Sequence, residues 1–246
     1  KVQVTLSGLQ SNFDESVTLF ENILSNAIPD EEALTNLKLA KIKERSDDKL
    51  NKQTILWSAM INYAKYGENS SFRNKMSVEE LNNVKSEELI DLIHNLTSYN
   101  HRILYYGPES MENIAKSLNV LHSNNTDLLD VPLKVVYEEL PLEIPTVFVV
   151  DYDMQQAEIL MVAKGSKYNA EKMPLIKLHN EYFGGSMGSI VFQTLRESKA
   201  LAYSVYSAYS TPRTADKSHY VTAYIGTQSD KLKEAMIGMD ELLTDL

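Results

Sequence analysis

The stretch FGGSMGSIVFQTLRESKALAYSVYSAY, residues 183–209, decides the fold of the second half of this chain. It begins with the adjacent glycines Gly184 and Gly185, which predict the end of one helix and a tight turn, because glycine readily adopts helix-terminating conformations. Apolar residues at helical spacing then predict an amphipathic helix over about 190–199. The aromatic alternation that follows is typical of a strand over 203–209. The stretch therefore predicts a turn, a helix and a strand in direct succession.

Patterns on both sides of this stretch predict the fold class. We expect further strands over 146–151, 157–163 and 220–225, with helical patterns between and after them. The strands are grouped with short connections, which favours an antiparallel or mixed sheet, because every parallel crossover would need a helix. We therefore predict an α+β fold, in which two-layer domains have a mixed or antiparallel sheet with helices on one face.

The first half of the chain has more helical patterns than strand patterns. Short strands are expected over 2–6 and 102–106, with several helices between and after them. Two strands make an incomplete sheet unless partner strands lie upstream of Lys1, and this first residue is not a methionine. We therefore expect the chain to be a fragment of a longer protein.

Residues 122–145 are polar and irregular and contain three prolines, which interrupt both helical and strand periodicity. This composition is typical of a connection between folded parts. We therefore predict one domain over 1–121, a linker over 122–145 and a second domain over 146–246.

Composition limits the classes of partner. The 246 residues are 43% hydrophobic, which is enough for a sizeable core, and the net charge is −10. A negative chain without a dense basic cluster argues against nucleic acid as a partner. No apolar run approaches the roughly 18–20 residues of a membrane-spanning helix, so we expect a soluble piece without membrane insertion. The absence of cysteine leaves the compartment open, and both bacterial periplasm and cytoplasm are permitted.

The histidine pattern does not predict a metal site. The five histidines stand at least seven residues apart, so none forms the i,i+4 pair that presents two imidazoles to one ion, and no His-x-x-Glu-His motif occurs. Packed or solvated histidines are the favoured interpretation, and a site assembled by folding from scattered residues is disfavoured. We therefore assign no catalytic, metal-binding or cofactor-binding residue in this chain.

Two hydrogen-bond donors within residues 183–209 are candidates for binding. Arg196 near the helix end and Tyr203 at the strand start could together present a planar fork and a phenol to a peptide carbonyl. From the residues alone, a surface arginine and a core tyrosine remain the commoner interpretation. Gly184 and Gly185 likewise favour a helix end over an anion-binding nest of backbone amides.

Residues 183–209 resemble the second-domain signature of the pitrilysin and insulin-degrading-enzyme family of zinc peptidases. In that signature a double-glycine turn precedes a helix that ends in Arg-Glu, followed by a Leu-(Gly/Ala)-Tyr strand start. The resemblance covers most of the chain, with 2–106 similar to the later part of one family domain and 140–246 to most of the next. It departs at Ala202, where glycine is usual.

The resemblance implies the C-terminal, non-catalytic half of such a peptidase, inactive on its own. It implies that Arg196 and Tyr203 bind the peptide substrate, and that zinc lies in the other half, on the same polypeptide or on a partner subunit. The parent protein would be a zinc metalloendopeptidase. The alternative is a relative that has lost the metal and serves as a scaffold or peptide-binding subunit, and a third hypothesis is an anion-binding module that uses Gly184 and Gly185.

Overall fold

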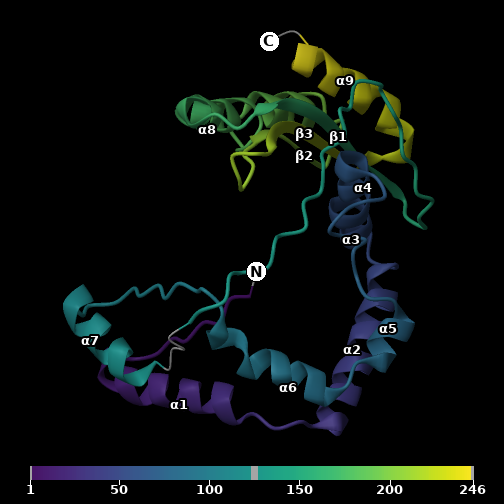
Figure 1. The fold of residues 1–246 in the computed structure, drawn as a ribbon. Coiled ribbons are helices and arrows are strands. Elements are labelled where there is room, and N and C mark those ends of the chain that lie inside the picture. The colour runs from purple at the N-terminus through teal and green to yellow at the C-terminus, as the bar shows by residue number, and fades with distance from the viewer. Residues whose placement is uncertain (1, 123–126, 245–246) are drawn as a thin grey trace. The chain divides into compact units, whose positions relative to one another are not determined.

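The computed structural model describes residues 2–122 and 127–244 and divides into two compact units (Figure 1). The first unit comprises Lys1–Arg45 and Met76–Val135, and the second comprises Ser46–Lys75 and Val136–Leu246. Each unit is therefore built from two separate stretches of the sequence.

The first unit consists of helices, several of which start at a side-chain cap. Ser77 accepts a hydrogen bond from the Glu80 amide at 3.1 Å, and the Glu80 carboxylate accepts one from the Ser77 amide at 2.7 Å. Ser110 caps another helix through the Asn113 amide at 3.2 Å. Helix α1 packs against α6 and α7. The helices are α1 (Phe13–Asn26), α2 (Glu31–Asp48), α5 (Val78–Asn83), α6 (Ser86–His94) and α7 (Met111–Leu121).

The second unit contains a three-stranded antiparallel sheet in the order β1-β3-β2. Its register pairs Ile159 with Ile225 on one side of the middle strand and Tyr206 with Tyr224 on the other. Sequence periodicity placed all three strands correctly to within a few residues. The strands are β1 (Gln156–Lys167), β2 (Ser204–Ser210) and β3 (Ser218–Gln228).

One face of this sheet carries the apolar core. Alternate side chains of a strand point to the same face, so Val205, Ala223 and Ile225 lie on one side together. That side is covered by α8 (Met173–Phe183), α9 (Leu232–Thr244) and the π-helical segment η5 (Phe192–Ser198). The buried core residues are Phe183, Val191, Leu195, Ala202, Val205, Ala223, Ile225, Ala235 and Met239.

The other face of the sheet is covered by aromatic packing from residues 52–66. Trp57 stacks on Tyr206 with ring centres 5.8 Å apart and lies 5.1 Å from the Tyr224 ring. Burial raises the pKa of both tyrosines to about 12, and neighbouring charged or phenolic groups add to the effect. The covering segment consists of α3 (Lys52–Thr54), the π-helical η2 (Ile55–Met60) and α4 (Ile61–Tyr66).

The predicted α+β class with an antiparallel sheet is confirmed, and helices cover one sheet face as expected, while residues 52–66 add a layer on the other. Three predicted strands, over 2–6, 102–106 and 146–151, were wrong, because they have no strand partner among the described residues. An extended apolar run becomes a strand only when a neighbour supplies hydrogen-bond partners. No helix in the described part of the chain is long and apolar enough to cross a membrane.

The compact units differ from the predicted division of the chain. Residues 46–75, which the prediction placed in the domain over 1–121, belong to the second unit, and so does the part of 122–145 that begins at Val136. The reason for the first difference is the packing of Trp57 on the sheet. The assignment of 1–121 and 146–246 to two family domains stays a prediction.

Candidate functional site

Arg196 and Tyr203 lie on consecutive elements of the second unit. Arg196 belongs to η5, and Tyr203 directly precedes β2. In η5 the backbone forms wider π-type turns, and the Lys199 amide donates to the carbonyl of Thr194 at 2.9 Å. Ala200 then adopts a φ of 49°, a left-handed conformation that ends the helix and redirects the chain.

The folded chain brings Arg196 and Tyr203 into contact. The guanidinium carbon of Arg196 lies 5.6 Å from the centre of the Tyr203 ring and 4.7 Å from that of Phe192. Exposed cation–π contacts of this kind contribute about 0.5–1 kcal/mol. The Tyr203 amide donates to the Gly226 carbonyl at 2.8 Å, which fixes the backbone under the phenol. The two donors are therefore held next to each other on a rigid strand start.

Both side chains are accessible from solvent. Tyr203 is 75% exposed, so it is not the core tyrosine that the commoner interpretation favoured, and the Arg196 side chain is 40% exposed. The nearest carboxylate oxygen, on Glu197, lies 3.7 Å from Nε of Arg196, too far for a hydrogen bond. Among the described residues, no protein acceptor receives a hydrogen bond from the Tyr203 hydroxyl or the terminal guanidinium nitrogens. These donors are free to bind a ligand.

The paired glycines form a close contact between α8 and β2. A Cβ atom on Gly184 would lie 2.4 Å from the carbonyl oxygen and 2.5 Å from the amide nitrogen of Ser207, so only glycine fits there. The amides of Gly184 and Gly185 both donate to the Asn180 carbonyl, at 3.2 and 2.6 Å. Because these amides already cap the helix, the structure favours the helix-end interpretation over an anion-binding nest.

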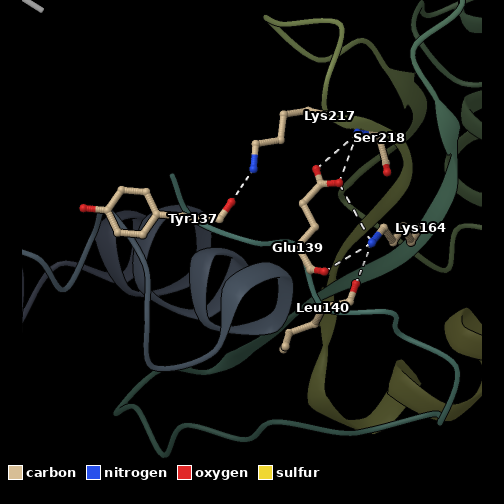
Figure 2. A network of polar contacts seen from close by, with 6 residues as sticks. All are labelled: Tyr137, Glu139, Leu140, Lys164, Lys217 and Ser218. Atoms are coloured by element: carbon tan, nitrogen blue, oxygen red, sulfur yellow. Dashed lines mark hydrogen bonds and ion pairs between the residues drawn. The ribbon is translucent and has the colours of Figure 1, made fainter. Parts of the chain in front are cut away.

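A second polar cluster, which sequence reasoning did not identify, surrounds Glu139 (Figure 2). Its carboxylate accepts hydrogen bonds from the Ser218 amide at 3.1 and 3.2 Å and lies 3.9 Å from the Lys164 ammonium. The Glu139 side chain is only 8% exposed. A single glutamate in an irregular segment has no sequence signal that would reveal these contacts.

The same cluster fixes the backbone of residues 137–140. Lys217 donates to the Tyr137 carbonyl, and Lys164 donates to the Leu140 carbonyl at 2.9 Å (Figure 2). The Leu140 amide in turn donates to the Lys65 carbonyl at 2.8 Å. Residues 137–140, which were predicted to belong to a linker, are therefore anchored to the second unit.

Buried titratable groups line this anchor. Burial lowers the pKa of Lys65, whose ammonium lies 4.1 Å from the Tyr220 ring centre, and the charge of Glu139 opposes that shift. Burial raises the pKa values of Tyr66 and Tyr220, and Glu139 acts in the same direction. The hydrogen bonds of the Glu139 carboxylate and of Lys164 join residues of separate segments, so the cluster has a structural role.

The histidines of the described residues mostly contact the backbone. His219 is fully buried, and its Nδ1 lies 3.1 Å from the Ser210 carbonyl. Folding brings His101 and His122 together, although their spacing of 21 positions gives no sequence signal. Within residues 2–122 and 127–244, no group of three or more metal-ligating side chains could hold an ion together.

Comparison with known proteins identifies relatives in sequence. A model of the peptidase M16 inactive domain matches residues 83–246. The chain is also 35% identical over 94 residues to YmxG of Bacillus subtilis (strain 168), an uncharacterized zinc protease, and this alignment covers 38% of the chain and 22% of that protein.

Solved structures share the fold. A peptidase M16 inactive domain from Pseudomonas fluorescens superposes with a TM-score of 0.67 at 14% identity, covering 95% of this chain and 57% of that one. The ferredoxin protease FusC, solved as a mutant in complex with Arabidopsis ferredoxin, gives a TM-score of 0.66 at 10% identity, covering 96% of this chain and 26% of that one. The chain thus spans less than two thirds of each of these relatives.

Proposed function

The chain belongs to the peptidase M16 family through its inactive domain, and on this premise we propose that it is the substrate-clamping, non-catalytic half of a zinc-dependent peptidase. The family match confirms the resemblance to pitrilysin-like zinc peptidases that residues 183–209 indicated. The observation that carries the proposal is the exposed contact between Arg196 and Tyr203, whose donors are unoccupied by other described residues.

The chemistry of this pair suits a peptide. A guanidinium group offers several N–H donors in one plane, and a phenol adds one more, so together they bind carbonyl oxygens along an extended chain. Where one of these oxygens develops negative charge during hydrolysis, a fixed donor stabilises the transition state. Loss of one such donor typically costs about 3–4 kcal/mol.

The catalytic zinc belongs to the other half of the proposed enzyme. This chain lacks a His-x-x-Glu-His motif, and its described residues bring no three ligands together, so they do not fit the metal that activates water in such peptidases. Arg196 and Tyr203 would act by holding the peptide while the zinc-bearing half supplies the hydrolytic chemistry. The two halves would enclose the substrate between them as a clamshell chamber.

Peptides or proteins are the substrate class that the comparisons support. FusC was solved with a protein, ferredoxin, and YmxG is described as a zinc protease. The alternative function is a metal-free scaffold or peptide-binding subunit without protease activity, and the absence of a His-x-x-Glu-His motif from this chain is compatible with both functions.

Zinc content and peptide cleavage, measured together, separate the two functions. The 246-residue chain and the complete product of its reading frame are compared by metal analysis and by cleavage of a quenched fluorescent peptide library. Cleavage by the complete product, with more zinc per molecule than the chain alone holds and no cleavage by the chain alone, supports the non-catalytic half. Peptide binding without cleavage in either sample, and without additional zinc in the complete product, supports the scaffold.

A further inference from the structure

In the first unit, we propose that His101 and His122 form a two-histidine site for a divalent transition-metal ion, oriented by Glu21. The site is separate from Arg196 and Tyr203 and does not depend on their role. Its core is a distance of 2.8 Å between the two Nε2 atoms, which face each other with the ring planes at 84°.

The hydrogen bond that each Nδ1 atom makes determines whether the Nε2 atom of the same ring carries a proton. Nδ1 of His101 lies 2.6 Å from the Tyr99 carbonyl oxygen, and Nδ1 of His122 lies 2.7 Å from a carboxylate oxygen of Glu21. Both of these oxygens only accept, so each Nδ1 must carry the proton. In two neutral rings, both Nε2 atoms then present lone pairs to the same point, and either a proton on one ring or a metal ion between the rings removes their repulsion.

This arrangement is the one that metal-binding histidines use. A ligating histidine almost always donates its second ring N–H to a carboxylate or a backbone carbonyl, which fixes the ring and raises its basicity. Here one ring has the carboxylate of Glu21 and the other has the carbonyl of Tyr99. Two imidazole nitrogens on a tetrahedral zinc ion, each at about 2.0–2.1 Å, lie roughly 3.3–3.4 Å apart. A separation of the rings by about half an ångström therefore admits the ion.

The surroundings allow this movement and give access to the ion. The His122 and Glu21 side chains are only 9% and 11% exposed, so this half of the site is packed between α1 and the end of α7. His101 is exposed and follows the Tyr99 backbone, which forms a bridge to Leu129. One fixed and one movable ring can close on an ion from solvent, with water completing its coordination.

Imidazole ligands select among metals. They suit zinc, copper and nickel, and affinity at such sites rises toward Cu²⁺. No third protein ligand is present among the described residues, so the site would bind these ions reversibly. An ion held there would connect the segment at His101 to helices α1 and α7 and thereby stabilise the first unit.

The test is calorimetric titration of the untagged 246-residue chain with Zn²⁺, Ni²⁺ and Cu²⁺ chlorides, with electron paramagnetic resonance of the Cu²⁺ complex. We expect one ion per chain, nitrogen hyperfine coupling from two imidazoles and a raised midpoint of thermal unfolding. His101→Gln should weaken binding at least tenfold while leaving the metal-free far-UV circular dichroism unchanged, because this ring is exposed. Glu21→Gln should weaken binding by about 10–100-fold through its partner ring.

His179→Gln is the matched control, since His179 is an exposed histidine of α8 that stacks on Phe183. The His179→Gln protein should bind the three ions with the same affinity as the wild type. The proposal is overturned if the wild type binds no stoichiometric ion, or if His101→Gln binds as tightly as the wild type.

Discussion

Trp57 stacks on Tyr206 with an angle of 18° between the ring planes, although the two residues lie almost 150 positions apart in the sequence. This contact attaches residues 46–75 to the sheet of the second unit. Because Trp57 is the only tryptophan of the chain, its fluorescence reports directly on this attachment.

Trp57→Ala should lower the free energy of unfolding by about 2–4 kcal/mol, because it removes a large, partly buried ring from two aromatic partners. Urea unfolding followed by circular dichroism measures the loss. Tyr182→Ala, at a tyrosine of α8 that is 67% exposed, is the control and should change the stability by less than about 0.5 kcal/mol. Equal stabilities of the Trp57→Ala and Tyr182→Ala variants would show that the aromatic layer does not form.

Ala200→Gly should stabilise the second unit by roughly 0.5–1 kcal/mol. Ala200 has a φ of 49°, a conformation that costs a residue with a Cβ more than glycine. Its carbonyl accepts a hydrogen bond from Lys231 at 3.1 Å, which holds the turn in place. Ala163→Gly, in the exposed part of β1, has ordinary strand geometry and should destabilise by a similar amount. Denaturant unfolding measures the free energy of unfolding of both variants. If Ala200→Gly and Ala163→Gly change it in the same direction, the left-handed conformation at Ala200 is contradicted.

Glu139→Gln should loosen residues 137–140. The variant keeps the shape of the side chain but removes the charge that faces Lys164 and the Ser218 amide, and charged hydrogen bonds contribute about 1.5–3 kcal/mol. We expect faster amide hydrogen exchange at Ser218 and in residues 137–140. Glu143→Gln, at an exposed glutamate of the same segment, should leave the exchange rates as they are. Protection that persists in Glu139→Gln would show that the anchor is not electrostatic.

Alkaline pH should destabilise the second unit through its buried phenols. Burial raises the pKa of Tyr206 and Tyr224 to about 12 from an ordinary value of 10.0, which means that the folded state favours the neutral ring. The resulting stabilisation is complete below pH 10 and is lost as the pH rises through about 12. Urea midpoints measured between about pH 9 and 12 should fall, and Tyr206→Phe should fall less steeply than the wild type.

The comparison between wild type and variant is needed because Lys65 changes the stability with pH in the opposite direction to the phenols. Burial lowers its pKa, so the unfolded chain binds more protons and Lys65 makes stability rise with pH below its ordinary value of 10.5. The difference between wild type and Tyr206→Phe cancels this contribution. Identical slopes for the two proteins would refute the burial of the phenol.

The sequence predicted the elements whose patterns are local. Alternation around Tyr206 and Tyr224 identified β2 and β3, since a strand with two packed faces places aromatic and small residues at regular intervals. A break separates α2 from the helical segments after it. Asn51 makes that break, because its side chain accepts hydrogen bonds from the Gln53 and Thr54 amides and starts a new helix.

Contacts between distant residues could not be predicted in the same way. The spacing of Arg196 and Tyr203 suggested a pair only through a family resemblance, and the π-type turns of η5 that bring them together have no distinct apolar period. The contact between His101 and His122 depends on the packing of separate helices, which no window of sequence contains.

The most direct test of the account is the turnover of a peptide by the complete protein carrying Arg196→Ala or Tyr203→Phe. We predict that each variant lowers kcat/KM by about 100-fold or more, because each removes a donor that stabilises the transition state, while the zinc content stays unchanged. Arg213→Ala and Tyr182→Phe, at other exposed residues, should stay within about twofold of the wild type. Unaltered turnover in both Arg196→Ala and Tyr203→Phe would contradict the proposed substrate-clamping role.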